Sequence, residues 1–415
     1  MRIAFFVYEY PPAIVGGLGT YATYITRFLV QQGHEVVIFT MNQGGVLKTY
    51  EVLDGVEVHR PVGINATNIF PLLLNEELRQ WGHFFNDIFI YNILSAAKFV
   101  NQVLPAKDSH FDIVAIHDWL SAIAGLVVRN DTDLPVVFHV HSTEWGRRGD
   151  AGSPFVGRLE HEMAFQAHRI ITVSHAMKDD LNCHGWPPAK VSVVWNGVDP
   201  SVYDPTAVSK QEVQELRARY GIGREDAMIL FVGRLTWVKG VRNLIQAMPS
   251  VIAEYPRSKL VILGKGEEQH DIDELVHRLD LSQHVVTHYA FVSEHERIVH
   301  YAAADLCAFP SVYEPFGIVS LEAMSMARPV VVGANGVVGF REQVVPSGPG
   351  QNGVHVNGND PGDIAWGIKA ILVDRAKARE MGAHGRARVQ RYFTWQQVAR
   401  QTVEVYEQVI AEGKE

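Results

Sequence analysis

Cysteine and long apolar runs are both scarce in this chain of 415 residues. The two cysteines, Cys183 and Cys307, lie far apart in the sequence, so we expect no disulfide and take a reducing, cytoplasmic compartment as the default location. The apolar run at residues 3–8 is followed directly by Glu9 and a proline pair, which is typical of a strand and its loop rather than of a secretion signal. No run reaches the roughly 18 apolar residues that a membrane-spanning helix needs.

Positively charged residues are also fewer than negatively charged ones. The chain has 37 Lys and Arg residues against 46 Asp and Glu residues, a net charge of −9 with histidine neutral. This balance argues against a general nucleic-acid partner, which needs a basic surface, and it weakens the case for docking on anionic lipid, so we expect no membrane association. Hydrophobic residues make up 47% and charged residues 20%, as in folded globular proteins, and the length suggests two domains.

Short apolar runs alternate with helical stretches in both halves of the chain. A helix is expected at residues 21–32 and ends at Gly33, and a polar stretch without strand pattern, residues 208–226, separates the halves. Strands that alternate with helices indicate doubly wound parallel sheets, so we predict an α/β protein with two Rossmann-like domains, 1–204 and 205–394, facing a cleft. The expected strands cover residues 3–8, 36–40, 113–116, 136–141, 170–173, 191–194, 228–232, 260–263 and 303–310.

Large apolar side chains recur at helical spacing within residues 76–104. The pattern i, i+3, i+4, i+7, i+8 of one helix face is followed by Trp81, Phe84, Phe85, Ile88 and Phe89. We favour a helix packed on the core of its domain, and a surface that faces the acceptor or a membrane is the alternative.

Two glutamates, Glu314 and Glu322, flank a Pro-Phe-Gly turn after the apolar run 303–310. The run predicts a buried parallel strand, and the residues from Gly317 onward predict a helix whose first amides favour a phosphate. A ligand with a phosphate at one end and hydroxyls at the other could reach both carboxylates, and a nucleotide sugar fits that description. Its binding residues in this segment are expected to be Phe316, Gly317, Ile318, Val319 and Glu322.

Two further phosphate-binding elements follow the strands at residues 228–232 and 3–8. After the first strand come Arg234, which can bind phosphate bidentately, and Lys239, which supplies a point charge. After the other strand, Gly16 and Gly17 precede a helix and let backbone amides approach a phosphate. This glycine-rich turn lacks the Gly-x-Gly-x-x-Gly spacing, which argues against an NAD-binding protein.

Histidines mark the ends of two strands in the first half. The triplet His117, Asp118 and Trp119 follows the strand at 113–116, and the carboxyl ends of strands face the cleft in an open α/β sheet. His139 and His141 share one face of the next strand.

The pattern Pro-Ser-x-x-Glu-Pro-Phe-Gly that ends at Gly317, with Glu322 in register, resembles the Glu-x7-Glu signature of retaining glycosyltransferases of the glycogen/starch synthase and sucrose synthase type, glycosyltransferase family 4. The resemblance covers nearly the whole chain and is nearest to the compact archaeal and bacterial glycogen synthases. It implies the GT-B fold, in which the last helix, here residues 395–415, returns to the first domain. Ile14, where bacterial and plant glycogen synthases have Lys, and Thr20 after the glycines depart from the family pattern.

The resemblance also implies roles for single residues. Glu314 would contact the hydroxyls of the donor sugar, Glu322 would hold the ribose, and His141 would hold the sugar from the first domain. The diphosphate would lie against Gly16 and Gly17. The residues expected to take part in the chemistry are His141, Glu314, Arg234 and Lys239. The residues expected to line the acceptor side are His117, Asp118 and Trp119.

The activity implied by the resemblance is retaining transfer of a hexose, with glucose as first choice, from ADP-glucose or UDP-glucose to a glucan or oligosaccharide. Lipid or small-molecule acceptors, as in sucrose, trehalose or cell-envelope glycan synthesis, are the alternative. No metal or other cofactor is expected, because two cations and a helix start already neutralise the diphosphate. Donor binding is expected to close the two halves, and homo-oligomer formation stays open.

Overall fold

The computed structural model describes residues 1–64, 78–79, 81–107, 109–290 and 292–413. The chain forms two compact units. Unit 1 comprises Met1–Val173, Lys178–Trp195 and Trp395–Glu415, and unit 2 comprises Ser174–Met177 and Asn196–Thr394. Among the described residues, no helix combines the length and the apolar character that crossing a membrane requires.

Unit 1 is built on a sheet that has eight strands within the described residues, in the order β3-β4-β2-β1-β5-β6-β7-β8. All neighbouring strands are parallel except β3 and β4, which form an antiparallel pair. The central strands are buried along their whole length because both faces of the sheet are covered. The strands are β1 (Arg2–Phe6), β2 (Glu35–Phe39), β3 (Tyr50–Leu53), β4 (Val56–His59), β5 (Ile113–His117), β6 (Val136–Val140), β7 (Arg169–Thr172) and β8 (Val191–Val193).

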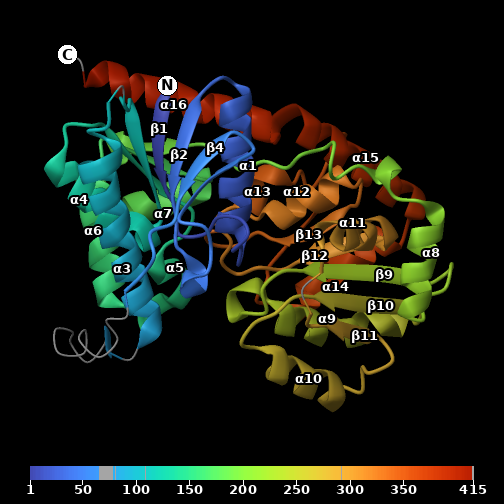
Figure 1. Cartoon of the computed structure of the whole chain (residues 1–415). Helices are drawn as coiled ribbons and strands as arrows, with labels where there is room; N and C mark the ends of the chain where they lie inside the picture. Colours follow the sequence, from blue (N-terminus) through green and yellow to red (C-terminus); the bar gives the residue numbers. More distant parts are fainter. Residues whose placement is uncertain (65–77, 80, 108, 291, 414–415) are drawn as a thin grey trace. The chain divides into compact units, whose positions relative to one another are not determined.

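The helices of the N-terminal half and the C-terminal helix are α1 (Gly17–Gln31), α3 (His83–Lys98), α4 (Ala122–Asp131), α5 (Glu144–Arg148), α6 (Pro154–Gln166), α7 (His175–Cys183) and α16 (Trp395–Glu412). Helix α16, drawn in red, packs against the blue helix α1 (Figure 1), and the rings of Tyr24 and Trp395 stack with their centroids 5.6 Å apart. A π-helical turn, Phe99–Val103, extends α3.

Helix α3 lies within the segment for which the sequence predicted an amphipathic helix. Phe85 and Ile88 are buried and α3 packs on α4, so packing on the core is confirmed for this part of the stripe. Phe84 is 49% exposed, because the apolar face of the helix is wider than the surface that packs on the rest of the domain. Residues 76–77 and 80 of the predicted span lie outside the described residues.

Unit 2 is built on a sheet of six parallel strands within the described residues, in the order β11-β10-β9-β12-β13-β14. The strand order reverses between β9 and β12, and in open α/β sheets ligands bind outside the carboxyl ends of the strands at such a point. The strands are β9 (Ala227–Val232), β10 (Ser258–Leu263), β11 (Val285–His288), β12 (Leu306–Phe309), β13 (Val330–Gly333) and β14 (Gly353–Val356).

The helices of unit 2 pack in groups: α9 contacts α10 and α14, α8 contacts α11, and α12 contacts α15. The stretch 208–226, predicted only as polar, contains α8, which begins with a capping box between Ser209 and Glu212. The helices are α8 (Lys210–Arg219), α9 (Val241–Glu254), α10 (Gln269–Arg278), α11 (Glu294–Ala303), α12 (Ile318–Ser325), α13 (Phe340–Gln343), α14 (Pro361–Leu372) and α15 (Arg375–Tyr392).

The predicted α/β class with doubly wound, mainly parallel sheets is confirmed. The starts of two elements were wrong by three residues or more. Helix α1 begins at Gly17 rather than at residue 21, so the glycine-rich turn forms the first turn of the helix. Strand β12 begins at Leu306 rather than at residue 303, because Ala303 is the last residue of α11. The hairpin β3–β4 and the strands β11, β13 and β14 were not predicted, although strands were predicted at β7 and β12, which are equally short.

Candidate active site

The loop after β9 holds Arg234 and Lys239, and its backbone is tied to neighbouring strand ends. The amide of Leu235 donates to the carbonyl of Lys265, and the carbonyl of Val238 accepts from the amide of Val312. Gly240, where α9 begins, has φ +67°, and an added Cβ would lie 2.1 Å from a backbone oxygen of the β12 loop. Close backbone packing therefore fixes this loop beside the end of β12.

Glu314 lies at the end of β12 and meets Lys239. The backbone of Glu314 is held by Val337 and Gly339 through hydrogen bonds of 2.9 and 2.8 Å. Its Oε2 forms a short ion pair with Nζ of Lys239 and accepts from Oγ of Ser311 at 3.5 Å. The structure therefore brings together two residues that lie far apart in the sequence, at the point where the strand order of unit 2 reverses.

Helix α12 starts directly after this loop. Gly317, with φ +90°, precedes it, and an added Cβ would lie 2.0 Å from the ring of Phe340, so only glycine fits. No side chain caps this helix start. The first amides of α12, from Ile318 and Val319, are therefore placed to bind an anion beside Glu314, and Phe316 is buried.

Glu322, the second glutamate of the pair, has a different environment. It is 4% exposed, and its Oε1 and Oε2 accept from the hydroxyls of Tyr203 and Tyr301 at 2.9 and 2.8 Å. Arg297 lies 3.5 Å from the same carboxylate. Burial, and then the charge of Glu322, raises the pKa of both tyrosines, and the charge of Glu322 raises the pKa of Arg297. In this structure the protein itself satisfies the carboxylate, so its contact with a ribose stays a prediction.

In unit 1, the glycine-rich turn at the start of α1 already holds a carboxylate. Oε2 of Glu9 accepts from the amides of Val15 and Gly16, each at 3.0 Å, and Gly17 is exposed. The turn is thus an anion-binding arrangement of backbone amides. The sequence analysis missed Glu9, although its position directly after the first strand was visible.

His117, His139 and His141 stack at the carboxyl ends of β5 and β6. The centroids of His117 and His139 are 4.3 Å apart, and Nδ1 of His117 lies 3.3 Å from Nε2 of His141. Nε2 of His139 lies 2.8 Å from the hydroxyl of Tyr406 on α16, so this buried histidine is held between β6 and the C-terminal helix. Burial lowers the pKa of all three imidazoles, so they are neutral at pH 7.

The same three histidines have ring nitrogens within 4.8 Å of one another, which raises the question of a metal. The rings of His117 and His139 lie 29° from parallel, and each imidazole directs its lone pairs within its own plane. Stacked rings therefore do not point at one common ion. Both nitrogens of His139 also lie near tyrosine hydroxyls. The cluster fits an aromatic stack better than a metal site.

Asp118 and Trp119 complete the strand-end triplet of β5. Asp118 has φ +54° and accepts from the amide of His141 at 2.7 Å, so it fixes the loop that carries this histidine. Trp119 packs on Trp81 at 5.7 Å. The side chains of His117, Asp118 and Trp119 are at most 6% exposed, so contact between them and an acceptor stays a prediction.

A buried acidic pair that the sequence analysis missed lies just beyond β6. Glu160 is 1% exposed and accepts from the amide of Glu144 at 3.0 Å, and Arg147 lies 3.7 Å away. Burial raises the pKa of Glu160 to about 8. Nothing in the spacing of these residues marked them as a cluster, because they meet only when α5 packs on α6.

Comparison with known families assigns both halves of the chain. Residues 15–202 match Glycosyltransferase Family 4, and residues 212–388 match Glycosyl transferases group 1. An uncharacterized glycosyltransferase of Methanocaldococcus jannaschii is 33% identical over 98% of this chain and 98% of its own length. A glycogen synthase of Mycobacterium tuberculosis is 29% identical over 98% and 94%. A D-inositol 3-phosphate glycosyltransferase of Kineococcus radiotolerans is 30% identical over 95% and 91%.

Solved structures share the fold. A sucrose-phosphate synthase from Thermosynechococcus elongatus superimposes with a TM-score of 0.80 at 24% identity over 99% of both chains. An Anabaena protein in complex with UDP and glucose gives a TM-score of 0.75 at 21% identity over 98% of this chain and 99% of its own. Because the two family matches cover both halves in order and the Methanocaldococcus relative aligns over nearly its full length, this chain is a glycosyltransferase of the GT-B fold that belongs to the group 1 and family 4 glycosyltransferases.

Proposed function

We propose that this glycosyltransferase transfers glucose, with retention of configuration, from ADP-glucose or UDP-glucose to a glucan or oligosaccharide. The observation that carries the proposal is the meeting of Lys239 and Glu314 beside the uncapped start of α12, at the strand reversal of unit 2. A cation, a carboxylate and free amides within one loop cluster suit a ligand that has both phosphate and hydroxyl groups. The relative named glycogen synthase supports a glucan as acceptor.

In the proposed reaction, negative charge develops on the departing diphosphate and positive charge on the sugar. Arg234 and Lys239 lie in the loop after β9, and the amides of Ile318 and Val319 begin α12, so both can stabilise the diphosphate. These groups take the role that a metal ion has in other transferases, and we propose that the enzyme needs none. When a diphosphate engages Lys239, its ion pair with Glu314 is released, which frees the carboxylate for the sugar hydroxyls.

Residues of unit 1 are also proposed to take part in donor and acceptor binding. Gly16 and Gly17 are proposed to offer their backbone amides to the diphosphate. In this structure the amides of Val15 and Gly16 donate to the carboxylate of Glu9, so this turn can hold an anion. His141 is proposed to hold the donor sugar, and its neutral ring can accept or donate one hydrogen bond. Glu322 is proposed to hold the ribose, and the acceptor side is assigned to the loop of His117, Asp118 and Trp119.

No second carboxylate is proposed as a covalent nucleophile. We propose instead that the acceptor hydroxyl attacks from the face that the diphosphate leaves, and that the departing phosphate oxygen takes the hydroxyl proton. The new glycosidic bond then has the configuration of the donor. Both cysteines are free in the structure, and the cytoplasm stays the proposed location.

A second candidate acceptor is a small phosphorylated polyol or sugar. It is favoured by the relative named D-inositol 3-phosphate glycosyltransferase, which is as similar to this chain as the glycogen synthase is. A lipid acceptor is kept as a third candidate for the product analysis.

The test is product analysis with both donors. The purified chain is incubated with ADP-glucose or UDP-glucose and, in turn, with maltoheptaose, glucose 6-phosphate, inositol 3-phosphate or a lipid extract, and the products are separated and their anomeric configuration is read by NMR. Extension of maltoheptaose with an α-linkage is expected, and Glu314→Gln, which keeps the side-chain shape, should abolish it. Products formed only with a phosphorylated small molecule would support the second candidate, and an inverted linkage would exclude the proposed mechanism.

A further inference from the structure

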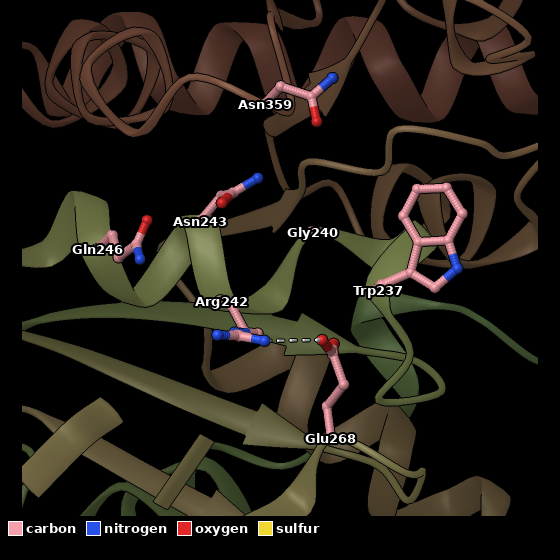
Figure 2. A pocket seen from close by; sticks show the side chains of 7 residues that line it. All are labelled: Trp237, Gly240, Arg242, Asn243, Gln246, Glu268 and Asn359. Atoms are coloured by element: carbon pink, nitrogen blue, oxygen red, sulfur yellow. Dashed lines mark ion pairs between the residues drawn. The ribbon is translucent and has the colours of Figure 1, made fainter. Parts of the chain in front are cut away.

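A pocket of about 260 Å³ opens on unit 2 beside the loop that carries Lys239 (Figure 2). Its walls come from the η8 turn (Trp237–Lys239), the first turns of α9, the segment before α10 and the loop before α14. The lining residues are Trp237, Gly240, Arg242, Asn243, Gln246, Glu268 and Asn359. Neither the family matches nor the proposed reaction assigns a role to this pocket.

The pocket holds a buried carboxylate with an unused oxygen. Glu268 is 7% exposed, and among the described residues its Oε2 has no hydrogen-bond partner. Arg242 lies 3.9 Å from Oε1 of Glu268 but nearer to Asp271, at 3.3 Å, so the arginine is shared. Burial raises the pKa of Glu268. A buried acceptor without a partner costs free energy, so a ligand that donates a hydrogen bond to it would recover that cost.

Apart from Glu268 and Arg242, the polar side chains that line the pocket are planar, neutral amides. The side-chain amide of Asn243 donates to the carbonyl of Gly358 at 2.7 Å, which fixes the amide plane and leaves its oxygen as an acceptor. Figure 2 shows Asn243 and Gln246 on α9 and Asn359 across from them. Together with Glu268, these side chains offer both donors and acceptors, which suits a ligand with several hydroxyls rather than a single charge.

Trp237 supplies an apolar face. Its side chain is 52% exposed, and in Figure 2 the indole stands at one end of the pocket, apart from the polar groups. A pyranose ring has two C–H faces that pack on an aromatic ring and an edge of hydroxyls that needs hydrogen bonds. The volume lies just below the ~300 Å³ at which pockets for drug-sized ligands begin, so it fits a single sugar ring rather than a whole nucleotide sugar.

From this combination we propose that the pocket is a subsite that binds one hexose unit of a carbohydrate chain, stacked on Trp237 and hydrogen-bonded to Glu268 and Asn243. The inference rests on the proposed function for the identity of the chain, an α-glucan. Because Trp237 and Lys239 belong to one turn, a bound glucan would lie beside the loop that carries the diphosphate-binding cation. The subsite would thus hold a long acceptor close to the reaction.

The probe is maltoheptaose, titrated calorimetrically into the full chain without donor. Trp237→Ala should weaken binding roughly tenfold, the change that corresponds to ~1.4 kcal/mol of lost aromatic contact. Glu268→Gln, which keeps the shape of the side chain, should also weaken binding. Trp366→Ala is the matched control, because Trp366 is 55% exposed on α14 and does not line the pocket. In kinetics, Trp237→Ala should raise KM for maltoheptaose and leave KM for the donor unchanged.

The outcomes separate this inference from the proposed function. If the wild-type chain transfers glucose to maltoheptaose and Trp237→Ala leaves its affinity and KM unchanged, the subsite is refuted and the proposed function stands. If maltoheptaose binds in a manner that depends on Trp237 but no transfer occurs, the subsite stands and the proposed function fails. A rise in KM for the donor alone would assign Trp237 to the nucleotide base and refute the subsite, and so would a wild-type chain that does not bind maltoheptaose.

Discussion

Tyr203→Phe removes one hydroxyl from the buried network around Glu322, and the structure allows an estimate of how much the free energy of unfolding should fall. Tyr203 is 2% exposed, and its hydroxyl donates to Glu322 at 2.9 Å and accepts a short hydrogen bond from Arg297. A hydrogen bond to a charged group contributes about 1.5–3 kcal/mol, and water cannot replace this hydroxyl at such a buried position. We expect a loss of about 2 kcal/mol in the free energy of unfolding, which for a unit of this size lowers its melting temperature by about 4–8 °C.

The assay is differential scanning calorimetry of the full chain, with Tyr220→Phe as the matched control. The hydroxyl of Tyr220 pairs with the imidazole of His300 at 2.8 Å, and burial lowers the pKa of this histidine, so the pair is neutral. A neutral pair contributes only about 1 kcal/mol, so the control should melt nearer to the wild type. If Tyr203→Phe melts with the wild type, the network around Glu322 does not stabilise unit 2, and the account of this carboxylate as satisfied by the protein is wrong.

Three further predictions concern Lys239, the absence of a metal requirement and the pKa of Glu160. Lys239→Ala should lower kcat about 100-fold, the usual cost of losing one contact to developing charge, whereas Lys259→Ala on β10 should not; a near-normal kcat would remove Lys239 from the mechanism. Millimolar EDTA should leave transfer intact, because two cations and a helix start serve the diphosphate; loss of activity that Mg²⁺ restores would contradict this. Burial raises the pKa of Glu160 to about 8. Between pH 4.5, the ordinary pKa of a glutamate side chain, and about 8, the folded protein keeps a proton that the unfolded chain releases, so the free energy of unfolding falls as pH rises. Glu160→Gln should remove this pH dependence. If the melting temperatures of the wild type and of Glu160→Gln differ by the same amount at pH 5 and at pH 8, the prediction is refuted.

The sequence allowed prediction of the elements whose pattern is local. Buried central strands such as β5 and β9 are continuous apolar runs, so their positions were predicted to within one residue at each end. The hairpin β3–β4 was missed because a glutamate interrupts each of its strands, Glu51 in β3 and Glu57 in β4, so neither is a continuous apolar run.

The candidate site was predictable where residues follow a strand end and not where they meet through packing. Lys239 and Glu314 each follow a strand, and parallel strands bring their carboxyl ends to one edge, so their meeting could be inferred. The partners of Glu322 come from a loop and from α11, and no spacing rule links them. Trp237 was assigned no role from the sequence, because its exposure beside a pocket is a property of the folded loop.

The central claim is that Arg234, Lys239 and the start of α12 bind the diphosphate without a metal. Calorimetric titration of UDP and ADP into the full chain, in EDTA, tests it most directly. The account predicts that at least one nucleotide binds, and that Arg234→Ala and Lys239→Ala each weaken its affinity about tenfold or more, since a charged hydrogen bond contributes about 1.5–3 kcal/mol. Lys259→Ala should bind as the wild type does. Equal affinity in all four proteins, or binding that appears only with a divalent cation, would contradict the account.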